Sequence, residues 1–346
     1  MNFSKNITYW YSNNKRDLPW RKTKNPYHIW LSEIILQQTQ VNQGLPFYEA
    51  FVNHFPSVFH LAEANEAEVL KLWQGLGYYS RARNLHASAK YVANELQGVF
   101  PNNYKELLKL KGVGDYTASA IASFCFNEST AVVDGNVYRV LSRYFGIDTP
   151  INSSKGSKAF KALAQELIDG NNPSEYNQAI MEFGAIQCKP KNPDCLACVF
   201  QDTCVAFNEN RVDALPVKIK SAKAKKKYFN FLVFISDDGK TILEQREGKG
   251  IWQNLYQFPL IETPSDISET VFQEHLSAHS LLKGQDYTWS LYNKDAIVHK
   301  LSHQHLYTRF WIINIKELNA QTIPINSIRD YAVPILIGNF IEEFSF

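Results

Sequence analysis

Four of the five cysteines lie within seventeen residues, as Cys188, Cys195, Cys198 and Cys204 in the spacing C-x6-C-x2-C-x5-C. Thiolates this close in sequence can hold zinc or an iron–sulfur cluster. Zinc modules usually place two C-x-x-C pairs well apart, whereas these cysteines follow one another around a single compact loop. Such a density, with so few cysteines elsewhere, favours metal or cluster ligation over disulfides or unliganded thiols.

Two carboxylic acids stand in settings that suit acid catalysis and cation stabilisation. Glu33 lies among apolar residues such as Trp30 and Ile34, where desolvation would raise its pKa and let it serve as a general acid. Asp134 ends an apolar run on a glycine-containing loop, where it would stay ionised. A proton donor with a carboxylate suits cleavage of a glycosidic bond through an oxocarbenium-like sugar. Taken alone, Glu33 would more often be a solvent-facing helix residue.

The stretch from residue 110 to 140 positions one of these acids. Two helices meet at the turn Gly112-Val-Gly114, and the second helix leads to the loop that carries Asp134. Glycine permits positive φ and close backbone approach, and a helix N-terminus presents free N–H groups to an anion. We therefore expect Gly112 and Gly114 to hold a phosphate, although a Gly-x-Gly between helices is by itself usually only a connection.

Composition and length indicate a soluble protein of two domains. The 346 residues are 45% hydrophobic and 20% charged, enough for two cores. The net charge of +2 is too small to indicate a nucleic-acid partner by itself. Because no run of eighteen residues is continuously apolar and the N-terminus has no apolar signal region, we expect no membrane and a cytoplasmic location, on the nucleoid in a bacterium.

The pattern of residues divides the chain into three parts. Residues 1–213 read as almost all helical, with helices over 27–41, 65–74, 80–96, from 102 or 103 into the hairpin near 107–127, 155–168 and 173–186. Residues 214–227 form a basic linker that holds six lysines and no acid. Residues 228–346 read as α+β, with a hairpin of 228–236 and 241–245, a helix over 267–282, strands over 287–292, 297–302 and 306–315, and a last helix after Pro334.

The hairpin with its following helix, Asp134 in VDGNVYRVLSR and the four-cysteine loop together resemble the helix-hairpin-helix DNA glycosylases that carry a 4Fe-4S cluster. Within that superfamily, WLSEIILQQTQV, LPWR and GLGYYSRARNLH are similar to the adenine DNA glycosylase branch, MutY. These motifs are long, and they coincide in order along the chain.

The resemblance implies roles for single residues. Glu33 would protonate N7 of adenine and later handle the attacking water, while Asp134 would stabilise the cation. Substrate and DNA would be contacted by Arg21, Gln38, Thr39, Tyr78 and Asn136, with Asn136 supporting the catalytic aspartate. Phosphate contacts are expected from the hairpin N–H groups and from nearby basic residues such as Arg81, Arg83 and Arg139, each of which could equally face solvent.

Tyr116 decides the expected reaction type. In relatives that also cut the strand, the residue two positions after the second hairpin glycine is a lysine that forms a Schiff base. Because this chain has Tyr116 there, we expect a monofunctional glycosylase that leaves an abasic site. Simple packing of the tyrosine against the hairpin is compatible with that expectation.

The part after the linker resembles the Nudix-like module with which the same family reads 8-oxoguanine. The family's Phe-Ser-His signature appears as Leu301-Ser302-His303, which implies Ser302 as the lesion contact, with His303 beside it. The helix SETVFQEHLSAH lacks the glutamate-rich metal box, so we expect recognition without pyrophosphohydrolysis. The histidines at 299, 303 and 305 are interpreted as structural and not as a zinc site.

We therefore expect a multidomain chain: an all-α helix-hairpin-helix glycosylase domain with an iron–sulfur cluster loop at 188–204, followed by an α+β Nudix-like domain. The expected function of this monomer is excision of adenine mispaired with 8-oxoguanine or guanine in double-stranded DNA. Two alternatives stay open: a related mismatch or oxidised-base glycosylase, and a non-catalytic, cluster-dependent DNA-binding protein.

Overall fold

The computed structural model describes residues 3–220 and 223–346, which form two compact units. The helical unit holds residues 3–63 and 84–220, and the mixed unit holds residues 64–83 and 223–346. Two residues of the predicted basic linker, 221 and 222, lie outside the described residues. No helix in the described part of the chain is both long and apolar enough to cross a membrane.

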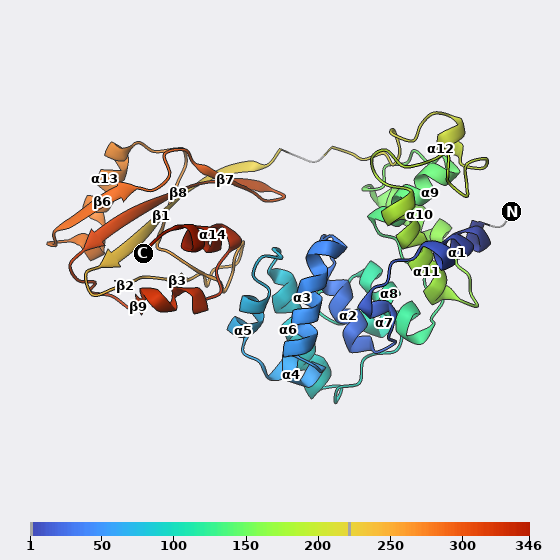
Figure 1. The fold of residues 1–346 in the computed structure, drawn as a ribbon, viewed down its shortest axis with the longest axis horizontal. Helices are drawn as coiled ribbons and strands as arrows, with labels where there is room; N and C mark the ends of the chain where they lie inside the picture. Colours follow the sequence, from blue (N-terminus) through green and yellow to red (C-terminus); the bar gives the residue numbers. More distant parts are fainter. Residues whose placement is uncertain (1–2, 221–222) are drawn as a thin grey trace. The chain divides into compact units, whose positions relative to one another are not determined.

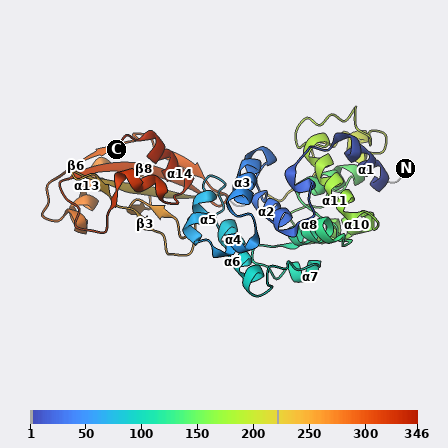
Figure 2. The same cartoon turned by 60° about the horizontal axis from the view of Figure 1, so that its bottom comes forward.

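The helical unit is built around α8 (Asp115–Phe126), which packs against α2 (Pro26–Ile35) and against α11 (Pro173–Glu182) (Figure 1, Figure 2). Every residue of α8 from Thr117 to Phe124 is buried, because small side chains let the neighbouring helices approach closely. The other elements are α1 (Phe3–Asn14), η1 (Pro19–Arg21), α3 (Val41–His54), α4 (Val58–Glu63), α6 (Ser80–Asn94), α7 (Tyr104–Leu107), α9 (Gly135–Phe145), α10 (Ser154–Leu167), η2 (Phe183–Gln187) and α12 (Val205–Asn208).

Most predicted helices of this unit are confirmed, and side-chain caps explain where they begin. Asn103 accepts the N–H of Glu106 at the start of α7, and Ser153 accepts that of Gly156 at the start of α10. The predicted helix over 27–41 is wrong in its second half. It ends at Ile35, and Gln38 has the left-handed φ of +55°, so the polar residues form a separate turn before α3.

The mixed unit has a five-stranded sheet in the order β5-β1-β8-β6, with β7 also paired to β8. The long strands β1 (Lys225–Ser236) and β8 (Gln304–Ile315) run parallel, and β5 (Leu260–Thr263), β6 (Tyr287–Leu291) and β7 (Ile297–Lys300) pair antiparallel. The remaining elements are α5 (Glu66–Leu72), β2 (Lys240–Thr241), β3 (Glu244–Gln245), β4 (Tyr256–Gln257), α13 (Glu269–Ala278), η3 (Ser280–Leu282), β9 (Ile323–Pro324), η4 (Ile325–Asp330) and α14 (Ile335–Glu343).

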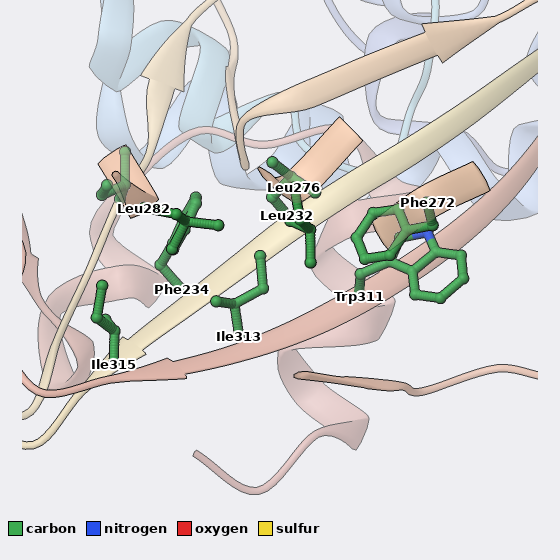
Figure 3. Close-up of a cluster of buried hydrophobic side chains, with 9 residues drawn as sticks. Leu232, Phe234, Phe272, Leu276, Leu282, Trp311, Ile313 and Ile315 are labelled. Atoms are coloured by element: carbon green, nitrogen blue, oxygen red, sulfur yellow. The ribbon is translucent and has the colours of Figure 1, made fainter. Parts of the chain in front are cut away.

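Alternating side chains of β1 and β8 build a separate core on each face of this sheet. Leu232, Trp311 and Ile313 meet Phe272 and Leu276 of α13, with the rings of Phe272 and Trp311 stacked (Figure 3). On the opposite face, Phe310 stacks on Phe340 of α14. Burial on both faces explains why β1 reads as a nearly continuous apolar run.

The predicted hairpin of 228–236 with 241–245 is wrong. β1 pairs with β8 along its whole length on one side and with β5 through Tyr228–Phe231 on the other. Residues 240–241 pair instead with β9, and residues 244–245 pair with β4. The strand also begins at Lys225, inside the predicted linker, because Lys225–Lys227 pair with Gln304–Leu306.

Residues 64–83 belong to the mixed unit, although they fall within the predicted helical domain. Lys71 Nζ donates to the carbonyls of Arg329 at 2.5 Å and Tyr331 at 3.3 Å. The hydroxyl of the buried Tyr79 donates to the carbonyl of Val333. These partners lie about 250 residues away in sequence, so the local pattern could not indicate them.

Candidate active site

The helical unit contains a cavity of about 930 Å³ that brings together the predicted catalytic residues. A cavity of this size can enclose a nucleotide. Residues predicted from the sequence that line it are Arg21, Glu33, Gln38, Thr39, Tyr116, Asp134, Asn136 and Arg139. The basic side chains of Lys189 and Lys191, from the cysteine loop, lie at the same cavity.

Glu33 is a buried acid on α2, with 6% of its surface exposed. Burial raises its pKa to about 7, and the charge of Asp134 adds to the rise. The hydrogen bond from Tyr116 and the charge of Arg21 oppose it. Glu33 is therefore partly protonated near neutral pH, as a general acid requires.

Asp134 is held as the N-cap of α9. Its Oδ1 accepts the N–H groups of Asn136 at 2.9 Å and Val137 at 2.8 Å, and its Oδ2 accepts Asn136 Nδ2 at 2.7 Å. Burial raises the pKa of Asp134, whereas these three hydrogen bonds and the charge of Arg139 favour its ionised form. Burial therefore raises the pKa of both acids, and Asp134 differs from Glu33 in that three protein donors and Arg139 oppose the rise.

A cluster of charged residues that was not predicted forms part of the cavity wall. Glu182 on α11 is 1% exposed and accepts paired hydrogen bonds from Arg16 and from Arg21, at 2.7 to 3.1 Å. Burial alone would raise the pKa of Glu182, but the hydrogen bonds from the two arginines outweigh it and lower the pKa to about 2. These ion pairs with Glu182 fix the Arg21 guanidinium at the cavity. Spacing on α11 was the available signal, since Gln178, Met181 and Glu182 share one helix face and all line the cavity.

The hairpin lies beside the turn that follows α2. Gly112 has φ +79° and its carbonyl accepts Gln37 Nε2, which also bonds Thr117 Oγ1. A Cβ at Gly112 would lie 2.9 Å from that of Asn84, so both its conformation and its surroundings require glycine. The expectation of positive φ is wrong for Gly114, which is the extended N-cap of α8 with φ −97°.

Two of the arginines expected at phosphates are instead structural. Arg139 is 8% exposed and donates to the carbonyls of Cys188 and Gly184 and to Asn136 Oδ1. Arg81 is equally buried in the mixed unit and donates to the carbonyls of Leu76 and Gly77. Arg83 donates to the carbonyl of Gln253. The guanidinium groups of these arginines interact with backbone carbonyls of the protein. Motif spacing alone does not predict these internal contacts.

Gly184, in the π-helical turn η2, sets the distance between this turn and Asp134's loop. A Cβ at Gly184 would lie 2.6 Å from Asn136 Cβ and 2.9 Å from the Asn136 carbonyl oxygen. We expect Gly184→Ala to displace Asn136 and lower the rate of base release about 10-fold or more, because small misplacements of a catalytic group are costly. Single-turnover kinetics would measure this rate.

The matched control for that substitution is Gly170→Ala, whose Cβ would meet only Ser129 Oγ at 3.9 Å. It should release base at the wild-type rate. A Gly184→Ala protein with unchanged kinetics would contradict the positioning role of this close contact.

The four predicted cysteine ligands line one small cavity of about 30 Å³ in the helical unit. Arg143 organises their loop, because its guanidinium donates to the carbonyls of Lys189, Pro190, Val212 and Leu215 and approaches Cys188 Sγ at 3.5 Å. Within residues 3–220 and 223–346, no three His, Cys, Asp or Glu side chains are close enough to hold one metal ion.

The predicted lesion-reading residues lie together in the mixed unit. The hydroxyls of Tyr78 and Ser302 are 2.6 Å apart, and the Tyr78 side chain is 47% exposed. The backbone of Tyr78 has the left-handed φ of +48°, and the Arg81 guanidinium lies over its ring as well as over that of Trp73. His303 is exposed next to Ser302, and its carbonyl accepts the N–H of Lys225.

Comparison with known proteins defines the class. Residues 31–168 match the HhH-GPD superfamily of base excision DNA repair proteins, and residues 230–343 match the NUDIX domain. A solved thermostable thymine-DNA glycosylase is 32% identical with a TM-score of 0.56, over 60% of this chain and 95% of that chain. A non-covalent endonuclease III–DNA complex, 20% identical with a TM-score of 0.52 over 60% and 94%, has the same fold. The fold and site define a DNA N-glycosylase of base excision repair.

Two relatives from the curated proteins identify the branch. The adenine DNA glycosylase of Buchnera aphidicola subsp. Baizongia pistaciae is 34% identical over 90% of this chain and 86% of its own length. That of Rattus norvegicus is 44% identical over 62% of this chain and 44% of its own length. The chain belongs to the adenine DNA glycosylase family.

Proposed function

We propose that this chain hydrolyses the N-glycosidic bond of adenine mispaired with 8-oxoguanine or guanine in double-stranded DNA and leaves an abasic site. The observation that carries the proposal is the pair of acids in one cavity, with Glu33 at a pKa of about 7 and Asp134 held by three donors. Membership of the adenine DNA glycosylase family supports adenine as the base.

In the proposed reaction Glu33 gives its proton to N7 of the extruded adenine. The bond between C1′ and N9 then breaks, its electron pair leaves with the neutral base, and the carboxylate of Asp134 stabilises the sugar cation. Water adds to C1′ and returns a proton to Glu33. Tyr116 offers a hydroxyl where a Schiff-base enzyme needs an amine, and it bonds Glu33 and Met181. The strand is therefore left uncut.

The decisive test is single-turnover base release from duplexes that carry A opposite 8-oxoguanine, A opposite G, and T opposite G, scored with and without alkali. The proposal requires adenine release from the first two and strand breaks only after alkali. Thymine release would favour the related mismatch glycosylase, and breaks without alkali would refute the monofunctional step. Binding without any release would favour the non-catalytic alternative.

We also propose that Cys188, Cys195, Cys198 and Cys204 hold a 4Fe-4S cluster. The four thiols surround one cavity, and four cysteine thiolates are the ligand set that a 4Fe-4S cluster uses, one for each iron. Bound there, the cluster would fix the loop that carries Lys189 and Lys191. Iron and sulfide counts near four per chain, with visible absorbance, are expected, and one zinc without iron would refute the proposal.

Ser302 is proposed to read the opposite base from beside Tyr78. Removing its hydroxyl by Ser302→Ala should lower the preference for 8-oxoguanine over guanine about 10-fold, the usual effect of one lost hydrogen bond. Release of adenine opposite guanine should hardly change. The preference is measured as the ratio of the two single-turnover rates at subsaturating enzyme. Ser290→Ala, at another exposed serine of the mixed unit, is the control, and equal preferences in both variants would contradict this role.

A further inference from the structure

One half of the sheet in the mixed unit lacks a covering helix on the α13 face. β1 and β8 are twelve residues each, about 40 Å long, whereas the ten residues of α13 span about 15 Å. The core under α13 uses Leu232 and Phe234 of β1 and Trp311, Ile313 and Ile315 of β8, at the end beside β6 (Figure 1, Figure 3). The other end, beside β7, extends past the helix.

The uncovered half carries aromatic rings where a core would carry aliphatic side chains. Tyr228 and Tyr307 are cross-strand partners on this face, both partly exposed, and their rings stack at 5.2 Å and 25°. Lys226 Nζ lies 5.5 Å from the centre of the Tyr307 ring. Val298, the β7 partner of Tyr307, is 41% exposed. This surface, which we call the tyrosine platform, is therefore aromatic and partly open to solvent.

The charges around the tyrosine platform favour an anionic partner. By strand register, Lys226, His305 and Lys300 lie on the same face as the rings. Arg309 borders the platform and forms an ion pair with Asp266 at 2.9 Å. Lys225 and Lys227 lie at the same end of β1, and Lys227 forms an ion pair with Glu262. No acidic residue occurs from Ala214 to Ser236. Apart from these two ion pairs, the strand partners on this face include no acid that faces Lys226 or Lys300.

We propose that the tyrosine platform binds unpaired bases of single-stranded DNA. Aromatic rings that alternate with lysines are the combination that binds single strands without sequence preference, because every base has a face to stack and every nucleotide a phosphate to pair. A paired duplex hides its base faces inside the stack, so the rings select unpaired nucleotides. None of the platform residues lines the catalytic cavity, and the platform begins where the Leu301-Ser302-His303 turn ends.

The test measures affinity of the full chain for a labelled unstructured oligothymidine and, separately, for a fully paired duplex. Tyr228→Leu combined with Tyr307→Leu keeps the sheet covered but removes both rings. It should weaken binding of the single strand about 10-fold or more, with duplex affinity and adenine release unchanged. Lys226→Gln should weaken single-strand binding and reduce its salt dependence by about one ion. The double Tyr→Phe variant at the same positions retains stacking and should bind like wild type.

Two controls and a direct readout make the result decisive. Tyr9→Leu removes a tyrosine that is 72% exposed on α1, and Lys283→Gln removes an exposed lysine of the mixed unit; neither should matter. Ultraviolet crosslinking of an iodouracil-labelled single strand should map to Tyr228 or Tyr307. Unchanged single-strand affinity in the double Leu variant, an equal loss for single strand and duplex, or crosslinks confined to other residues would each overturn the proposal.

Discussion

Glu33→Gln is expected to slow adenine release by at least about 100-fold while the mispaired duplex stays bound. The amide keeps the shape of the side chain on α2 and can still accept the Tyr116 hydrogen bond, but it cannot transfer a proton. General acid catalysis typically contributes 10² to 10⁴ in rate, about 3 to 5 kcal/mol. Single-turnover rates and equilibrium binding of one duplex, measured side by side, separate the two effects.

The wild-type rate should also depend on pH through this group. The pKa of Glu33 is about 7, so the protonated fraction and hence the rate fall about 10-fold per pH unit above that value. Glu33→Gln should lose this alkaline limb. Glu63→Gln, at an exposed acid at the end of α4, is the matched control and should keep both the rate and its pH profile.

Stability supplies an independent check of the same pKa. Between about pH 4.5 and 7 the folded protein keeps the Glu33 proton that the unfolded chain has already lost, so the free energy of unfolding falls as pH rises through this range. Glu33→Gln removes that dependence. At pH 8 the variant should be more stable than wild type by about 2–4 kcal/mol, shrinking toward zero at pH 4. A difference independent of pH would contradict a raised pKa.

Features encoded over short distances in the sequence were predictable. Asn65, Asn103 and the start of α6 at Ser80 lie where helices begin, because capping needs only a side chain and an N–H two or three residues on. The sequence also indicated the four cysteines, the hairpin glycines and the two acids. Residues of these types in such spacings are seldom found together unless they form a functional site.

Features that depend on distant partners were not predictable. The polar residues after Ile35 leave the helix because Gln37 bonds the hairpin some 75 residues later. From its local sequence Glu182 would be predicted as a surface acid, because its partners Arg16 and Arg21 lie about 160 residues earlier in the chain. The residues after Gly239 do not pair back onto β1 because they pair with β9 and β4, which come later in the chain. In each case a tertiary contact decides the structure, and the local sequence pattern holds no information about the distant partner.

Asp134→Asn is expected to lower the rate of adenine release by about 100-fold or more without unfolding the helical unit. Asparagine caps helices about as well as aspartate, so one oxygen can still accept the N–H groups of Asn136 and Val137. The lost feature is the negative charge that faces the developing sugar cation, and removing one such electrostatic contact typically costs 10² to 10³ in rate.

The reason this charge matters lies in how the protein holds it. Three donors and the nearby Arg139 keep the carboxylate oriented before substrate arrives, so little reorganisation accompanies charge development. Asn25→Asp makes the reverse exchange at the cap of α2 and should leave the rate unchanged. Melting temperatures of all three proteins should agree within a few degrees. An Asp134→Asn protein that releases adenine within a few fold of wild type would mean that the cation is stabilised elsewhere.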